Sequence, residues 1–366
     1  MVKNVFEGSY KMTYMVGNGF DLGCGLKSRF DDTYKVYVED RSNDSKTISN
    51  FKYNIKKHIL FAAQNRTSQD INWSDFEMGM AKYAESLSSE VEFVECVRDY
   101  SIFLTDYLQR QEETFYNDYN KQGKDAQIAW NTHICDSVLL YYKGLNNNDI
   151  EVLQNETTNH TSFSINIINF NYTSTFETLL KNAIVKQQID RLPVNIDDTV
   201  HIHGNLQDSI VLGVDNMSQF GNLKYKLSEM GELCFIKPTL NNAFDKQRVT
   251  RANNIIQSSD LICVDGMSLG DSDLTWREAI SSWLVDSERH HLIYYDFELM
   301  RKKGLTAFDM LMTEKIKKAE FLKKLSITKD VSNQIHFPIG NLFFNIIYVP
   351  YTHEKKDAPA TPFIFK

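Results

Sequence analysis

The chain has 366 residues, which is too long for one minimal core and suits a large domain with an insertion, or two domains. A formal net charge of −8 gives no whole-chain attraction for nucleic acid, so we expect no nucleic-acid partner. No leader pattern opens the chain, and no stretch approaches the roughly 20 apolar residues of a membrane span, so we expect a cytoplasmic protein without a membrane partner.

The first elements in chain order are a short strand and a long helical region. Residues 12–16 form an apolar run that the tight turn Gly17-Asn18-Gly19 interrupts before a helical pattern begins. From about residue 29 to residue 139 apolar side chains recur at helical spacing. An Asn/Thr-rich stretch at 146–161 then has the composition of an exposed loop.

Strand patterns return in the second half of the chain. They occur at 165–170, 200–203, 210–214, 261–265, 292–296 and 344–349. Helical patterns separate several of them, at 173–186, 242–257, 274–288 and 307–325. This alternation predicts an α/β fold with a doubly wound, Rossmann-like and mostly parallel sheet. We expect residues 1–40 and 160–366 to form this core and residues 41–159 to form a large helical insertion.

Polar or glycine-rich motifs follow four of the predicted strands. Because ligands bind beyond the carboxyl ends of strands in an open parallel sheet, these motifs supply the candidate site residues. The first is Gly17-Asn18-Gly19-Phe20-Asp21, whose glycines allow a sharp turn and a close approach to an anionic ligand. The turn lacks the third glycine of the dinucleotide-binding fingerprint, so a purely structural turn is an equal alternative.

The second motif is Asn169-Phe170-Asn171-Tyr172-Thr173, which places donors and acceptors at a strand end. The alternative is that Asn171 or Thr173 merely caps the next helix.

The third motif is His201-Ile202-His203-Gly204. Strand alternation places both histidines on one face, but zinc needs a third ligand and none is spaced nearby, so no metal site is predicted. His203, at the strand terminus, can act as a general base near neutral pH.

The fourth motif is Gly266-Met267-Ser268-Leu269-Gly270-Asp271-Ser272-Asp273. A small turn with hydroxyl groups before an acidic helix start suits the hydroxyls of a ribose. Asp271 or Asp273 can equally be the N-cap of the helix at 274–288. The four motifs in this order together predict a crevice that binds a nucleotide.

Five segments together resemble the abortive-infection AbiH family of bacterial phage-defence proteins. They are Gly17-Asn18-Gly19-Phe20-Asp21-Leu22, Trp73-Ser74-Asp75-Phe76-Glu77, Asn169-Phe170-Asn171-Tyr172-Thr173, His201-Ile202-His203-Gly204 and Gly266-Met267-Ser268-Leu269. The resemblance extends from about residue 12 to residue 351. It implies a role in phage defence, with a phage-encoded trigger and a homo-oligomer as candidate partners.

More distantly, the same motifs resemble the sirtuin-like fold of defence NADases, which implies NAD as substrate or ligand. In that comparison Gly17 and Gly19 approach the diphosphate, and Gly266 with Ser268 holds the adenosine ribose. Asn171 positions the other ribose or an attacking water, and His203 is the base. The remaining expected cofactor-binding residues are Asn18, Phe20, Asp21, Thr173 and Leu269.

The chemistry implied by this resemblance is hydrolysis of the nicotinamide–ribose bond, with Asn171 and His203 as the catalytic residues. Its transition state is of the oxocarbenium type, so the enzyme must bury the ribose, hold a water and supply a base. Two alternatives stay open. One is a nucleotide-binding sensor without chemistry. The other is a metal-dependent hydrolase of a phosphate or nucleic-acid bond, in which Asp21, Asp271 or Asp273 holds the ion.

Overall fold

The computed structural model describes residues 7–40, 44–62, 73–183, 188–189, 192–245, 247–270, 273–296, 299 and 305–339. Its centre is a seven-stranded sheet with the order β3-β4-β2-β1-β5-β6-β7. The strands are β1 (Glu7–Val16), β2 (His160–Asn169), β3 (Gln188–Ile189), β4 (Leu192–His201), β5 (Leu261–Asp265), β6 (His291–Tyr295) and β7 (Ile335–His336).

The strand order makes this a Rossmann-like sheet. All neighbouring strands are parallel except β3, which forms a short antiparallel pair with β4. From β1 the chain proceeds outward to β2 and β4, then returns past β1 to β5, β6 and β7. The sheet therefore reverses direction between β1 and β5, the point where doubly wound folds bind their ligands. The predicted fold class is confirmed.

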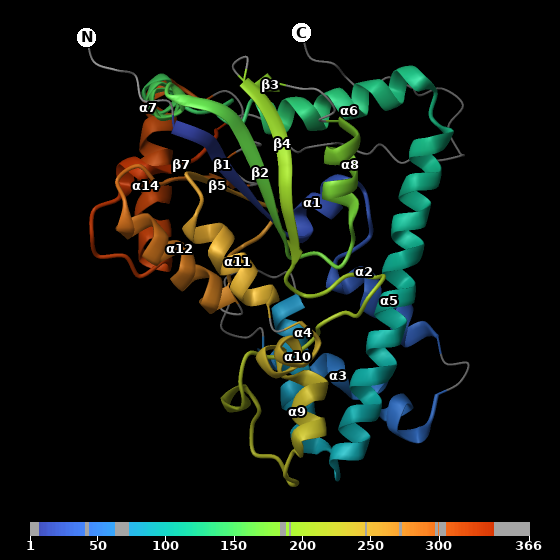
Figure 1. Cartoon of the computed structure of the whole chain (residues 1–366). Helices are drawn as coiled ribbons and strands as arrows, with labels where there is room; N and C mark the ends of the chain where they lie inside the picture. The colour runs from blue at the N-terminus through green and yellow to red at the C-terminus, as the bar shows by residue number, and fades with distance from the viewer. Residues whose placement is uncertain are drawn as a thin grey trace, which may run out of the picture.

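Helices cover both faces of the sheet (Figure 1). On one face lie α1 (Asn18–Gly23), α6 (Lys124–Leu139), α7 (Asn147–Thr157) and α8 (Thr175–Ala183). On the other face lie α11 (Arg248–Gln257), α12 (Leu274–Asp286) and α14 (Ala307–Lys324). Side chains of β1 alternate between the two cores, with Tyr14 in the first and Met15 in the second, as the two-residue period of a strand requires.

A separate layer of helices lies beyond the carboxyl ends of the strands (Figure 1). Its elements are α2 (Phe30–Glu39), α3 (Lys46–Ala62), α4 (Trp73–Tyr83), the 3₁₀ turn η1 (Ala84–Ser86), η2 (Met217–Gln219), α9 (Glu229–Phe235) and α10 (Lys237–Phe244). The helices α2, α3, α4 and α9 share a third core that includes Phe76, Met80 and Tyr83, all buried. The ring of Phe76 lies 4.3 Å from that of Tyr100, measured between centroids.

The longest helix, α5 (Glu90–Lys121), joins this layer to the sheet. It begins at Ser89, whose side chain accepts a hydrogen bond from the Glu92 amide and so satisfies a free donor of the first turn. Its first half contributes side chains such as Phe93 to the third core, whereas Phe115 and Tyr119 pack in the core beneath the sheet. One rigid element therefore contacts both parts of the molecule.

Two sequence predictions of loop and strand are wrong. Residues 146–161 form α7 and the start of β2 rather than an exposed loop, because Asn146 caps the helix and Leu153 buries its side chain. Residues 210–214 form only isolated bridges, because Gly213 has a φ of +151° and turns the backbone away from a strand path. The predicted strand at 344–349 lies outside the described residues.

Two element boundaries also differ from the prediction. The helix expected at 242–257 is divided into α10 and α11, which are separated at Asp245 by an extended φ of −151°. Strand β4 ends at His201, so His203 lies in the following turn and not on the same strand face as His201. The chain bends at this point because Gly204, with a φ of +75°, adopts the left-handed conformation that favours glycine.

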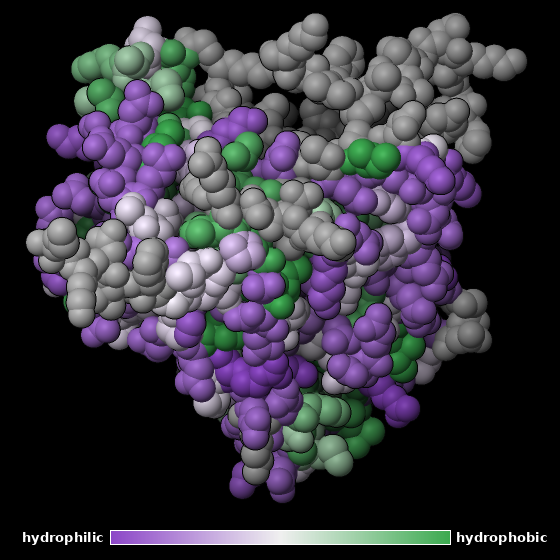
Figure 2. Space-filling view, turned by 45° about the horizontal axis from the view of Figure 1, so that its top comes forward, coloured by the Kyte–Doolittle hydropathy of each residue, from purple (hydrophilic) through white to green (hydrophobic). Residues whose placement is uncertain are grey.

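The surface is mainly hydrophilic in the view of Figure 2, with apolar residues in separate patches and not in one continuous face. Among the helices of the described ranges, none combines the length and the apolar character that a membrane span requires.

Candidate functional site

The register of the sheet brings the predicted motifs to one edge. His201, Asn169, Val16, Asp265 and Tyr295 are level with one another on five neighbouring strands. Each is the last residue of its strand. The turns that follow β1, β2, β4 and β5 therefore lie side by side, as expected for the carboxyl edge of a parallel sheet.

At the switch point the turns after β1 and β5 are in direct backbone contact. The Gly17 amide donates to the Asp265 carbonyl at 2.8 Å, and the Gly19 amide donates to the Gly266 carbonyl at 2.7 Å. A Cβ atom on Gly19 would lie 2.5 Å from the Cα of Gly266, closer than any side chain permits. Gly266 also has a φ of +66°. These glycines are required by the contact between the two turns.

The side chains of Asn18 and Phe20 also serve local structure. Asn18 donates through Nδ2 to the Ser28 carbonyl at 3.0 Å and accepts from Ser28 Oγ at 2.5 Å. Phe20 is buried with its ring centroid 4.9 Å from that of Phe176. Both contacts fix α1 and the segment after it.

Two buried carboxyl groups flank the switch point. Thr173 donates through Oγ1 to Asp21 Oδ2 at 2.6 Å, while Asp21 Oδ1 has no hydrogen-bond partner among the described residues. Burial raises the pKa of Asp21 to about 7, although the bond from Thr173 opposes the change. Burial likewise raises the pKa of Asp265 to about 7, and its Oδ2 also has no hydrogen-bond partner within the described ranges. Both groups exchange protons near neutral pH.

Asn171 is held at three points. Its amide donates to Asn169 Oδ1 at 2.8 Å, and its Nδ2 donates to the Gly17 carbonyl at 3.0 Å. Its own carbonyl lies 3.1 Å from Nδ1 of His201. The residue is buried, yet Oδ1 forms no hydrogen bond with any described residue. The side chain therefore presents an unused acceptor in a fixed direction.

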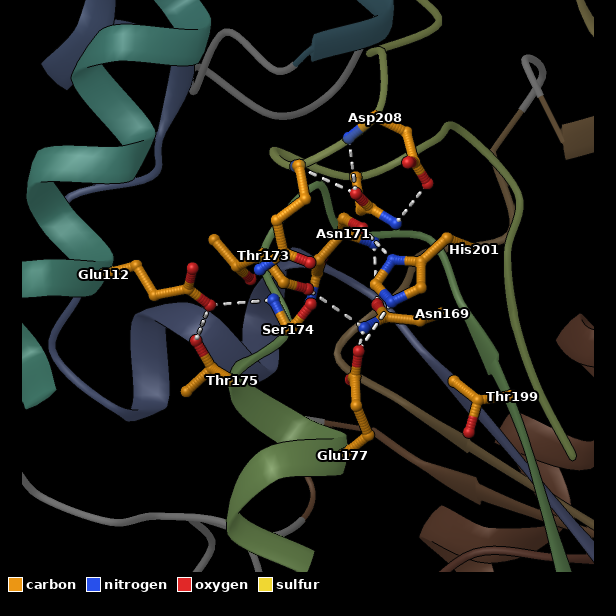
Figure 3. Close-up of polar contacts among 12 residues, drawn as sticks. Glu112, Asn169, Asn171, Thr173, Ser174, Thr175, Glu177, Thr199, His201 and Asp208 are labelled. Atoms are coloured by element: carbon orange, nitrogen blue, oxygen red, sulfur yellow. Dashed lines mark hydrogen bonds and ion pairs between the residues drawn. The ribbon is translucent and has the colours of Figure 1, made fainter. Parts of the chain in front are cut away.

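The ring of His201 lies between Asn171 and Glu177 in Figure 3. Nδ1 faces the Asn171 carbonyl, and Nε2 lies 2.5 Å from Glu177 Oε1. With an acceptor at each nitrogen, the ring is bound as an imidazolium paired to a carboxylate. Burial opposes both charges, but their mutual hydrogen bond and attraction outweigh it, so the pKa of His201 is raised and that of Glu177 is lowered. Asn169 Nδ2 donates to Glu177 Oε2 at 2.9 Å and completes the pair.

Glu112, on α5, connects the helical layer to the same network (Figure 3). Its Oε1 accepts from the Ser174 amide at 2.8 Å and from Thr175 Oγ1 at 3.4 Å, at the start of α8. Burial raises the pKa of Glu112. Neither Glu112 nor Glu177 was among the sequence candidates, because each occupies an ordinary polar position of a helix.

His203 lies in the turn after β4 and is not hydrogen-bonded to this network through any described contact. Its ring meets Phe170 and Tyr172 at centroid distances of 5.8 and 6.4 Å, and Nδ1 has no hydrogen-bond partner in the part of the chain that the structure describes. Burial lowers the pKa of His203 well below its usual range, and the positive charges of Lys237 and Arg248 lower it further. The imidazole is therefore neutral at pH 7.

A buried ion pair closes the space between this edge and α4. Lys237 donates through Nζ to Glu77 Oε2 at 2.8 Å, and the Gly213 amide donates to Glu77 Oε1 at 3.2 Å. A hollow of about 10 Å³ lies beside the pair, just enough for one water molecule. Glu77 belongs to one of the five resemblance segments, whereas Lys237 carried no sequence signal.

The turn after β5 contains one residue with a strained backbone, and its side chains range from buried to exposed. Leu269 is fully buried with a φ of +49°, a conformation uncommon for a residue with a side chain. Ser268 is exposed, and its carbonyl accepts from Lys324. Asp273 accepts from the Gly270 amide at 2.8 Å and stands at the N-cap of α12 without a side-chain cap bond. Asp271 lies outside the described residues.

A larger cavity, of about 290 Å³, lies away from the strand ends between α2 and α3. Its lining consists of Phe30, Asp31, Tyr34, Lys35, Val38, Lys56 and Ile59.

Across the described ranges, no group of three or more His, Cys, Asp or Glu side chains is placed to hold a metal ion.

The family model for bacteriophage abortive infection AbiH matches residues 13–295, a range that contains all four strand-end motifs and the α4 segment. No curated protein matches the sequence. The chain belongs to the bacteriophage abortive infection AbiH family.

Proposed function

We propose that this AbiH protein binds NAD at the carboxyl edge of the sheet and, on infection, hydrolyses its nicotinamide–ribose bond. The observation that carries the proposal is a pair of side-chain atoms, Asn171 Oδ1 and His203 Nδ1, that have no hydrogen bond among the described residues. The surrounding polar groups of the β2 and β4 turns are bonded to one another, while Asn171 Oδ1 and His203 Nδ1 are not.

The fixed amide of Asn171 suits the placement of a water or a ribose hydroxyl. Three hydrogen bonds hold the residue, so its Oδ1 needs no reorganisation when it accepts a hydrogen bond. Holding a nucleophile beside the anomeric carbon is one of the main tasks in cleaving an N-glycosidic bond through an oxocarbenium-like transition state.

His203 suits the role of a proton acceptor because its ring is neutral. The nearby charges of Lys237 and Arg248 keep its pKa low in the free protein. A bound nucleotide brings negative charge that opposes these cations, which raises the basicity of the ring when substrate is present. The distant resemblance of the motif order to that of sirtuin-like NADases is a second reason to choose these two residues.

The test is to follow NAD, nicotinamide and ADP-ribose by mass spectrometry in infected cells and with purified protein. We expect nicotinamide and ADP-ribose to appear together, and His203→Gln to lower the rate by about a hundredfold or more. His58→Gln, on α3, is the matched control and should retain activity. If NAD stays intact in infected cells while His203→Gln still protects the culture, hydrolysis is not the function.

A nucleotide-binding sensor without chemistry is the second candidate. The low pKa of His203 favours it, because burial and the charges of Lys237 and Arg248 make the imidazole a weak base. A sensor would keep its defence activity in His203→Gln and lose it in Gly19→Val. The opposite sensitivity, with loss in His203→Gln and intact folding, supports the enzyme.

A further inference from the structure

The glycine turn does not offer its amides to a phosphate in this structure. The amides of Gly17 and Gly19 both donate to carbonyls of the turn after β5. A nucleotide at this edge therefore needs another group to bind its phosphates. Arginine is suited to this task because its planar guanidinium matches phosphate oxygens in pairs.

Arg248 is such a group, because it is buried and only weakly bonded. It is 9% exposed, and its Nη1 donates to Asn241 Oδ1 at the long distance of 3.4 Å. Its Nε lies 3.8 Å from Asp245 Oδ2, beyond hydrogen-bond distance, and the Asp245 side chain is 36% exposed. A buried arginine normally has strong partners, because burying an unpaired charge is costly.

The position of Arg248 also points to the proposed site. It is the first residue of α11, which packs against β4, the strand that ends at His201. Its charge is felt by both His201 and His203. Lys237, the other cation near His203, is already neutralised by Glu77 at 2.8 Å.

We propose that Arg248 binds a phosphate group of the nucleotide at the start of α11, beside the turn that carries His203. The ligand class is a nucleoside diphosphate such as the ADP-ribose part of NAD. This inference rests on the proposed nucleotide site but not on hydrolysis. In this arrangement Arg248, which follows β4 in the chain, binds the phosphate. The glycine turns only hold the ends of β1 and β5 together.

The matched control lies on the same helix. Arg251 pairs with Asp198 at 2.6 Å, and its side chain is 44% exposed. Arg248→Gln and Arg251→Gln therefore remove the same charge from α11 at a buried and at an exposed position. Arg248→Lys keeps the charge without the fork of donors, and it covers the case in which Arg248→Gln does not fold.

Titration calorimetry with ADP-ribose, adenosine and inorganic pyrophosphate tests the inference. We expect Arg248→Gln to weaken ADP-ribose binding by about tenfold or more and to leave adenosine binding unchanged. Arg248→Lys should be intermediate, and Arg251→Gln should match the unsubstituted protein. Pyrophosphate should compete with ADP-ribose only where Arg248 is present.

The outcomes separate the inference from the proposed function. Unchanged ADP-ribose affinity in Arg248→Gln, or in Arg248→Lys if only that variant folds, overturns the role of Arg248 even if NAD is hydrolysed. A phosphate-dependent loss of binding without any NAD cleavage supports Arg248 and overturns hydrolysis alone. If the unsubstituted protein binds neither ADP-ribose nor pyrophosphate, both ideas are rejected.

Discussion

His201 and His203 are two residues apart, yet they belong to regions of opposite character. His201 has an acceptor at each ring nitrogen, the Asn171 backbone carbonyl and the Glu177 carboxylate, and Asn169 donates to the same carboxylate. His203 has a ring nitrogen without a partner, and nearby Arg248 is weakly bonded. Because buried polar groups are normally satisfied, the first region is built for stability and the second has bonding capacity left for a ligand. We therefore expect substitutions in the His201 region to lower stability and substitutions in the His203 region to weaken ligand binding.

The largest loss of stability is expected for Gly266→Ala. The added Cβ would meet the Phe20 nitrogen at 2.5 Å, in a backbone conformation with a φ of +66°. Strain and overpacking together should lower the free energy of unfolding by roughly 2–6 kcal/mol. Chemical denaturation measures the loss. Gly8→Ala is the control, since nothing lies within 4 Å of its added Cβ.

Glu177→Gln should lower the free energy of unfolding by about 3 kcal/mol, because it leaves the buried His201 without its counter-charge. His203→Gln should lower the free energy of unfolding much less and should instead weaken ligand binding. Denaturant midpoints of the two variants provide the measurement. Equal losses of stability would remove the distinction between the two regions.

The pH dependence of stability should report Asp21. Burial raises its pKa from 3.8 to about 7, so the folded chain retains a proton that the unfolded chain releases. The stability from this proton is complete below about pH 4 and is lost as pH rises through 7. Between about pH 5 and pH 8, Asp21→Asn should therefore gain roughly 2 kcal/mol relative to the unsubstituted protein.

Asp309→Asn is the control for that experiment. A hydrogen bond from Thr306 lowers the pKa of Asp309, so this carboxylate stays ionised throughout the range. Its substitution should have the same effect at each pH. An Asp21→Asn effect that is equally constant would show that Asp21 is ionised in the folded protein.

Ser28→Ala should have the smallest effect, about 1 kcal/mol, because it removes the hydrogen bond to Asn18 Oδ1 and leaves that from Asn18 Nδ2 to the residue 28 carbonyl. Thermal unfolding measures the change. Nucleotide binding should be unaffected. A loss of binding without a loss of stability would place Asn18 at the ligand.

The sequence was sufficient to predict the doubly wound sheet and the convergence of its turns. Short apolar runs identify strands, and parallel strands place the following residues at one edge. It could not predict the partners of those residues. Glu112, Glu177 and Arg248 occupy ordinary helical positions, and their roles arise only from packing between distant segments. The reason for glycine in the first turn also became clear only from its contact with Gly266, almost 250 residues away.

The same limit explains the error at α7. Its Asn-rich sequence is typical of a loop, but Asn146 serves as a cap by accepting from the Asp149 amide at 2.9 Å. The buried Leu153 then fixes the helix against the sheet. Composition alone does not distinguish an asparagine that ends a loop from one that begins a helix.

The length of α5 has a mechanical consequence. Its 32 residues extend over about 48 Å, from the helical layer to the core beneath the sheet. Glu112 bonds the Ser174 amide, three residues beyond Asn171. A tilt of α5 would therefore act as a lever, and a small displacement where its first turn packs would move the backbone beside the unused acceptor of Asn171.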